Sequence, residues 1–200
     1  MFLTRMALDV NRPEAAALIV SPGLMNLTVR LMFAGGNLHP LYRLDQIGSR
    51  VWLVLLSHLR PEMLAAHARY GYPGVFPSWE TFDYEDTLQT VAEGSVLHFE
   101  LSASPFDVPE DGQLPPAEAA EEWLASQGAG SGFDLIREQL TGYGQLSAED
   151  EQFSVGRWSG KLRVTDQERF LYALHTGIGL HRSDFGQGLM TVSTSRTIWD

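Results

Sequence analysis

Residues 177–190 read GIGLHRSDFGQGLM, a glycine-rich segment that is more specific than any other part of the sequence. Its glycines are Gly177, Gly179, Gly186 and Gly188. Glycine lets a backbone turn sharply and pass close to a helix or a ligand, and its N–H group can donate to a phosphate oxygen. Helical spacing precedes the segment and a β-prone run follows it, so the sequence predicts a helix-loop-strand connection.

The second half of the chain, of which this segment is a part, predicts the order βαββαβ. Asp166 can cap the helix that leads into the segment, because its carboxylate can accept from the first free N–H groups. Apolar residues then recur on one helical face. The expected ranges are strands over 96–102, 133–146, 153–164 and 189–192, and helices over 117–127 and from 166 onward.

The first half repeats this order without obvious sequence repetition. Period-two alternation predicts a first strand over 2–8. Pro22, with Ser21 as its N-cap, begins a helix that Gly35-Gly36 is expected to end. The remaining elements are strands within 41–44 and 51–56, a helix over 62–70 and a fourth strand within 85–91.

We therefore expect an α+β protein of two tandem ferredoxin-like (RRM-like) units with antiparallel sheets. The first unit is expected over residues 1–92. The second is expected over 93–200, and it carries the glycine-rich loop 177–188.

Composition limits the possible functions. The chain has no cysteine, which excludes disulfides, thiolate metal sites and a cysteine nucleophile. Its formal charge of -11 lowers the expectation of RNA binding without excluding it, because an acidic protein can hold one basic patch. No apolar run approaches the roughly 20 residues of a membrane-spanning helix, and residues 1–10 predict a strand rather than a signal peptide. We expect a cytoplasmic protein.

The glycine-rich segment resembles the loop of CRISPR RNA-processing proteins. Further segments narrow the resemblance to the CasE family of CRISPR repeat-processing endoribonucleases, and together they cover nearly the whole chain. They are LYRLD at 41–45, LSASP at 101–105, PAEAAEEWL at 116–124 and WSGKLRVTDQER at 158–169. The resemblance implies binding of repeat RNA hairpins and RNA cleavage without a metal or cofactor.

The sequence departs from the family where the chemistry would occur. The family has a histidine and a nearby tyrosine on the first helix, which help proton transfer as a ribose 2'-OH attacks the adjacent phosphate. Asn26 stands at the histidine position and Gly23 at the tyrosine position. Neither can transfer a proton, so we expect that cleavage is lost. His39 or His181 are the possible substitutes for the lost catalytic histidine.

Candidate RNA-binding residues lie in the loop and on a neighbouring strand. Two loop residues, His181 and Arg182, can hold a phosphate together with the four glycines. Asp184 adds an acid, and Ser102 stands where the family has an arginine. The strand residues are Arg157, Lys161 and Arg163, which share one face because side chains alternate along a strand. No histidine spacing indicates a metal site.

Aromatic residues are dense near the expected domain junction. They are Tyr70, Tyr72, Phe76, Trp79, Phe82 and Tyr84. We predict that they pack between the domains rather than form a surface on which bases stack, although an exposed subset would suit a protein partner.

Three functions remain open from the sequence. The first is a protein that holds a CRISPR repeat hairpin without cutting it. The second is a repurposed acidic paralogue that acts through a protein partner, as a CRISPR effector subunit, a toxin or antitoxin component, or a nucleic-acid mimic. The third is a ribonuclease that uses a relocated histidine.

Overall fold

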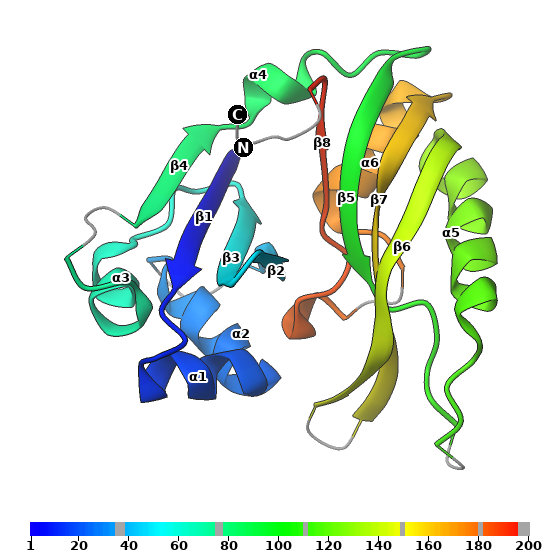
Figure 1. The fold of residues 1–200 in the computed structure, drawn as a ribbon. Coiled ribbons are helices and arrows are strands. Elements are labelled where there is room, and N and C mark those ends of the chain that lie inside the picture. The colour runs from blue at the N-terminus through cyan, green and yellow to red at the C-terminus, as the bar shows by residue number, and fades with distance from the viewer. Residues whose placement is uncertain (35–38, 75–77, 110–111, 149–150, 180–181, 196–200) are drawn as a thin grey trace. The chain divides into compact units, whose positions relative to one another are not determined.

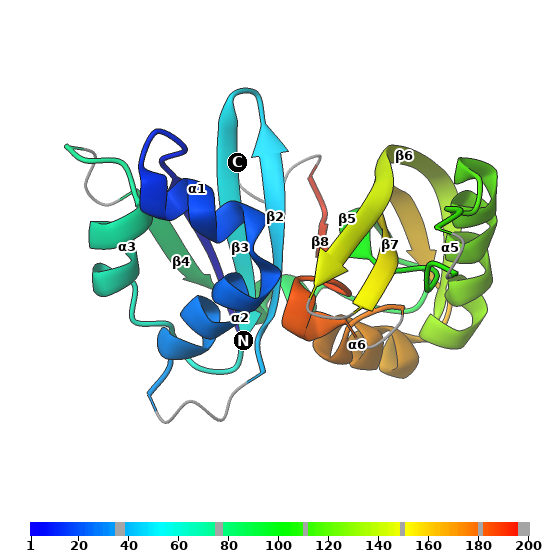
Figure 2. The same ribbon diagram turned by 90° about the horizontal axis from the view of Figure 1, so that it is seen from below.

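The chain folds into two compact units (Figures 1 and 2). The computed structural model describes residues 1–34, 39–74, 78–109, 112–148, 151–179 and 182–195. Unit 1 comprises Met1–Glu85 and Ser183–Gly186, and unit 2 comprises Asp86–Arg182 and the residues from Gln187 onward. Within the described ranges, no helix is both long enough and apolar enough to cross a membrane.

Unit 1 is an antiparallel sheet covered by helices on one face (Figure 2). The strands follow the order β2-β3-β1-β4. Their bounds are β1 (Phe2–Leu8), β2 (Leu41–Ile47), β3 (Arg50–Ser57) and β4 (Trp79–Asp83). The helices are α1 (Pro13–Val20), α2 (Pro22–Leu31) and α3 (Leu64–Tyr70), followed by the short α4 (Glu85–Leu88). Alternate residues of the central strands, such as Met6 and Leu53, pack against Leu18, Met25 and Val29 of the helices.

Local signals account for several of these boundaries. The Ser21 side chain accepts from the N–H of Leu24 at 3.4 Å and Pro22 occupies the first turn, so α2 begins where the sequence predicts. Gly35-Gly36, expected to end this helix, lies outside the described residues. Helix α1 was not predicted from the sequence. It begins at Pro13, whose missing N–H is tolerated in a first turn.

The predicted fourth strand within 85–91 is wrong. The strand is β4, which pairs with β1 so that Phe2 lies opposite Asp83 and Met6 opposite Trp79. The Asp83 carboxylate then accepts from the N–H of Glu85 at 3.0 Å. This local hydrogen bond turns the chain out of the sheet, and residues 85–88 are therefore helical.

Unit 2 has the same design with longer central strands (Figure 1). Its sheet follows the order β6-β7-β5-β8. The strands are β5 (Val96–Ala103), β6 (Phe133–Ala148), β7 (Glu151–Val164) and β8 (Met190–Ser193), and the helices are α5 (Ala117–Ser131) and α6 (Gln167–Thr176). Strand β6 lies at one edge of the sheet and its pairing with β7 contains two bulges. The predicted α+β fold of two ferredoxin-like units with antiparallel sheets is confirmed.

Aromatic contacts fill the core of unit 2. Trp158 of β7 lies 5.6 Å from Trp123 of α5, centroid to centroid, and Phe133 meets the edge of Phe170 of α6 at 5.7 Å. All of these side chains except Trp123 are fully buried. Both helices therefore pack on the same face of the sheet. Because side chains alternate along a strand, the other residues of β5, β6 and β7 point to the opposite face.

The start of α6 is fixed by the residue that the sequence predicts. The Asp166 carboxylate accepts from the N–H of Arg169 at 3.0 Å, and the backbone N–H groups of Thr165 and Asp166 donate to the carbonyl of Gly132. The cap therefore connects the beginning of α6 with the end of α5.

Replacing Asp166 with alanine is expected to lower the free energy of unfolding by about 1 kcal/mol, because the first turn of α6 loses its acceptor. Chemical denaturation followed by tryptophan fluorescence measures this change, since Trp123 and Trp158 both report on the core of unit 2. Gln167→Ala is the matched control and should change stability by less than about 0.5 kcal/mol. Equal stability of the two variants would show that the cap contributes nothing.

Candidate functional site

The glycine-rich segment follows a path that requires glycine at two points. Gly179 has φ of +102°, and a Cβ there would lie 3.1 Å from the Trp123 ring and 3.2 Å from the carbonyl oxygen of Ser104. Gly186 has φ of +76°, and a Cβ there would lie 2.9 Å from the Tyr42 ring. Packing and backbone conformation therefore account for both glycines without a ligand.

Backbone amides of the segment donate to protein acceptors. The N–H of Gly188 donates to the carbonyl of Ser102 at 2.7 Å, and the N–H of Ile178 donates to the carbonyl of Gly188 at 2.9 Å. The N–H of Gly177 donates to Ala173 at 2.9 Å, at the end of α6. A phosphate would have to displace these carbonyls to use the same donors.

Ser102 also supports the segment through its side chain. It stands where the resemblance expects an RNA-binding arginine, yet it is only 3% exposed and its hydroxyl hydrogen-bonds Gln187 Oε1 at 3.0 Å. This position therefore holds the loop in place from within unit 2.

The loop arginine is already paired with two carboxylates. Arg182 Nη2 donates to Asp107 Oδ1 at 2.7 Å and Nη1 donates to Glu151, while the guanidinium lies 5.1 Å from the centroid of Phe153. Its side chain is 20% exposed. Most of its charge is thus compensated within unit 2, which sequence reasoning missed because both acids are distant in sequence. His181 lies outside the described residues.

The two positions at which the resemblance expects catalytic residues lie on α2. Gly23 is exposed, and apart from its chain neighbours and the backbone of its own helix no described residue comes within 4 Å of where its Cβ would be. Asn26, one turn further on, is half-buried. The short helix η1 (Ser183–Phe185), which comes from the glycine-rich segment, packs against α2 within unit 1. The structure therefore brings these two sequence-predicted regions together.

His39 and Tyr42 both contact Asp184 of η1. His39 Nδ1 lies 3.6 Å from Asp184 Oδ1, and the histidine side chain is 60% exposed. The Tyr42 hydroxyl donates to the backbone carbonyl of Asp184 at 2.7 Å. Burial, followed by the Asp184 charge, raises the pKa of Tyr42 well above its usual range, so this phenol stays protonated at all physiological pH values. His39 is therefore an exposed histidine beside a carboxylate of the glycine-rich segment.

A basic row of exposed side chains runs along β7. Arg157, Lys161 and Arg163 are exposed, whereas the alternate residues Trp158 and Leu162 are buried against the helices. The basic row therefore lies on the open face of the sheet, away from α5 and α6.

Two further residues extend the basic row sideways, and sequence reasoning missed both. Lys161 pairs with His98 of β5 on one side and with Arg137 of β6 on the other. Arg137 is exposed and His98 is half-buried. The β-bulge between Leu135 and Arg137 shifts the register by one residue. Without it, Ile136 would lie opposite Lys161, and with it Arg137 takes that position.

No group of three or more potential metal ligands occurs among the residues that the structure describes. The basic row is a candidate site within unit 2, and the cluster of α2, η1 and His39 is a candidate site within unit 1.

Comparison with solved structures shows a shared fold. Thermus thermophilus Cse3, bound to an RNA that represents a pre-cleavage complex, superposes with a TM-score of 0.78 and 24% identity, covering 96% of this chain and 98% of that chain. Cas6e from Escherichia coli K-12 gives a TM-score of 0.64 and 15% identity, covering 96% and 99%. A search of curated proteins found no significant match.

The sequence model of a family described as CRISPR associated protein matches residues 1–194, almost the entire chain. The fold, with its two ferredoxin-like units, agrees with this match. The chain therefore belongs to the CRISPR associated protein family.

Proposed function

We propose that this protein binds the stem-loop of a CRISPR repeat RNA and does not cut it. The observation that carries the proposal is the basic row on the open face of unit 2, where Arg157, Lys161 and Arg163 are exposed and Arg137 lies opposite Lys161. When exposed cations of a protein contact RNA phosphates, counterions are released from the RNA, and this release favours binding. It can do so even though the net charge of this protein is -11. The solved Cse3 structures with bound RNA support the choice of ligand.

The proposed loss of cleavage rests on α2. Attack by a ribose 2'-OH needs a base to remove its proton and an acid to protonate the departing oxygen. Asn26 has a carboxamide that does not titrate near neutral pH, and Gly23 has no side chain. His39 is exposed beside Asp184 and is the described histidine that would carry the chemistry if the protein were a ribonuclease.

One prediction of this proposal concerns RNA binding and the integrity of the RNA strand. Purified protein mixed with a repeat stem-loop at low salt should bind it saturably, and the RNA should remain intact on a denaturing gel. Affinity should fall steadily as salt rises. Lys161→Ala should weaken binding severalfold and lower the slope of log affinity against log salt by about 1.

Arg69→Ala is the matched control, because it removes one exposed cation from α3 in unit 1. It should leave the salt slope unchanged. Absence of saturable binding at low salt would overturn the proposal. RNA cleavage that His39→Ala abolishes would replace it with a ribonuclease that uses a relocated histidine.

A second prediction concerns the carboxylates that hold Arg182. Asp107→Asn combined with Glu151→Gln should raise RNA affinity roughly threefold to tenfold, because the guanidinium becomes available to a phosphate and two repelling charges disappear. Filter binding measures the change. The control pair Glu121→Gln and Glu122→Gln removes the same charge from exposed positions of α5. An equal gain in the control would show that only net charge matters.

A protein partner is the second candidate function, and one surface favours it. Leu24, Leu27 and Leu31 lie at helical spacing on α2 and are 38%, 55% and 74% exposed. An apolar row on a helix that faces solvent is typical of a docking surface. The acidic charge of the chain would suit a basic partner.

The corresponding prediction is that Leu27→Asp prevents co-purification of CRISPR effector proteins while the affinity for RNA stays unchanged. Leu59→Asp is the control, because Leu59 is 52% exposed and lies outside α2. Recovery of RNA without any stoichiometric protein from the native host would contradict this second function.

A further inference from the structure

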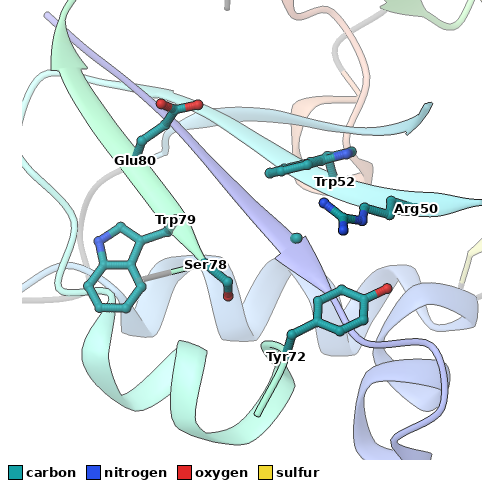
Figure 3. A pocket seen from close by; sticks show the side chains of 7 residues that line it. Arg50, Trp52, Tyr72, Ser78, Trp79 and Glu80 are labelled. Carbon is teal, nitrogen blue, oxygen red and sulfur yellow. The ribbon is translucent and has the colours of Figure 1, made fainter. Parts of the chain in front are cut away.

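Unit 1 contains a cavity of about 250 Å³ that none of the preceding functions uses (Figure 3). It forms at Ala7 near the end of β1, at the beginning of β3, and where the chain that follows α3 enters β4. Its volume lies below the roughly 300–1,000 Å³ of pockets that hold drug-sized ligands. The cavity therefore suits a single small ring system.

Aromatic residues from three elements line the cavity, although the Trp79 ring itself points to the helical side of the sheet (Figure 3). Trp52 comes from β3, Tyr72 follows α3 and Trp79 begins β4, and all three are half-buried. Trp52 lies on the sheet face away from the helices, since its neighbour Leu53 packs in the core on the helical side. Trp79 is tilted against His67 with ring centroids 4.9 Å apart. Trp52 and Tyr72 thus offer ring faces for stacking.

The cavity also contains a buried hydroxyl without a partner. Ser78 is 8% exposed and lines the cavity, and its Oγ has no hydrogen-bond partner within the described ranges. A buried hydroxyl that loses water without gaining a partner costs free energy. The Oγ is enclosed by protein in this conformation, and rotation of the Ser78 side chain toward the cavity would let a ligand with a polar edge restore the hydrogen bond.

The charges around the cavity favour an anionic ligand. Glu80 is paired with Arg5, whose guanidinium lies 4.8 Å from the centroid of Trp52. Arg50 is exposed, makes no ion pair among the residues described, and lies 5.8 Å from the centroid of Tyr72 (Figure 3). Its guanidinium can leave that ring to meet a phosphate at the mouth of the cavity.

We propose that this cavity binds one unpaired nucleotide of the RNA, an inference that rests on the proposed RNA-binding function. The base lies against the rings of Trp52 and Tyr72, its polar edge hydrogen-bonds Ser78, and its phosphate meets Arg50. A planar ring with a hydrogen-bonding edge and an attached anion is the chemistry that these four side chains match. Stacking on aromatic side chains of a sheet is a common way to bind single-stranded RNA.

The test compares a blunt repeat stem-loop with stem-loops that carry a short single-stranded flank on the 5' or the 3' side. One flank is expected to raise the affinity of the wild-type protein roughly tenfold, within the range found for stacking of one base. Trp52→Ala should remove that gain and leave the affinity for the blunt stem-loop unchanged. Tyr72→Ala should reduce the gain, and Trp52→Phe, which keeps a ring, should retain most of it.

The control is Tyr172→Ala, because Tyr172 is an aromatic residue of α6 in unit 2 that is 70% exposed. It should keep the full gain, and thermal unfolding verifies that every variant is folded. A flank that adds nothing, or a gain that survives both Trp52→Ala and Tyr72→Ala, overturns the inference while the proposed function stands.

Two other outcomes separate the two proposals further. If the blunt stem-loop does not bind, the proposed function fails, and a single-stranded oligonucleotide then decides on the cavity. If the oligonucleotide binds the wild-type protein and Trp52→Ala abolishes this binding, the proposed role of the cavity is supported. If the oligonucleotide does not bind, that role is overturned. If Trp52→Ala instead removes a co-purifying protein and leaves the flank gain intact, the cavity belongs to a protein partner and the inference is wrong.

Discussion

The hydrogen bond from the N–H of Gly188 to the carbonyl of Ser102 is the constraint on which the candidate site depends. It holds the end of the glycine-rich segment beside β5 just before β8 begins, and Gly188 in turn accepts from Ile178 at the segment's other end. The segment is thereby closed into a loop with fixed ends. Residues 183–186, in the middle of this loop, belong to unit 1 and form the turn against which α2 packs.

This closed loop separates two roles that a glycine-rich motif can combine. Glycines can expose amides to a phosphate, or they can let a chain pass where a side chain would clash. Here the second role is visible at Gly179 and Gly186, and the amides of Gly177 and Gly188 bind protein carbonyls. With Arg182 held by Asp107 and Glu151, the exposed cations of unit 2 that lie side by side are Arg157, Lys161 and Arg163 on the sheet, where Asp134 stands opposite Arg163. The basic row is thus the stronger candidate for binding phosphates.

The sequence predicted those features that depend on neighbouring residues. Ser21 and Asp166 cap their helices as expected, because a cap needs only an acceptor two or three residues before its donors. The fourth strand of unit 1 was misplaced, since its pairing with β1 depends on residues about eighty positions away. The ion pairs of Arg182 and the place of Arg137 beside Lys161 likewise depend on tertiary packing and on a bulge. The proposed loss of catalysis, with Asn26 at the histidine position, rests only on the family resemblance.

The bulges of β6 have a consequence for self-association. Strand β6 spans Phe133–Ala148 at the edge of its sheet, and an edge of that length offers unpaired backbone groups to any other chain with β-structure. The register shifts after Leu135 and Leu140 interrupt that edge, and the charged residues Arg137 and Glu138 beside the first shift repel a flat partner strand. The bulge that places Arg137 beside the basic row therefore also protects this long edge strand against aggregation.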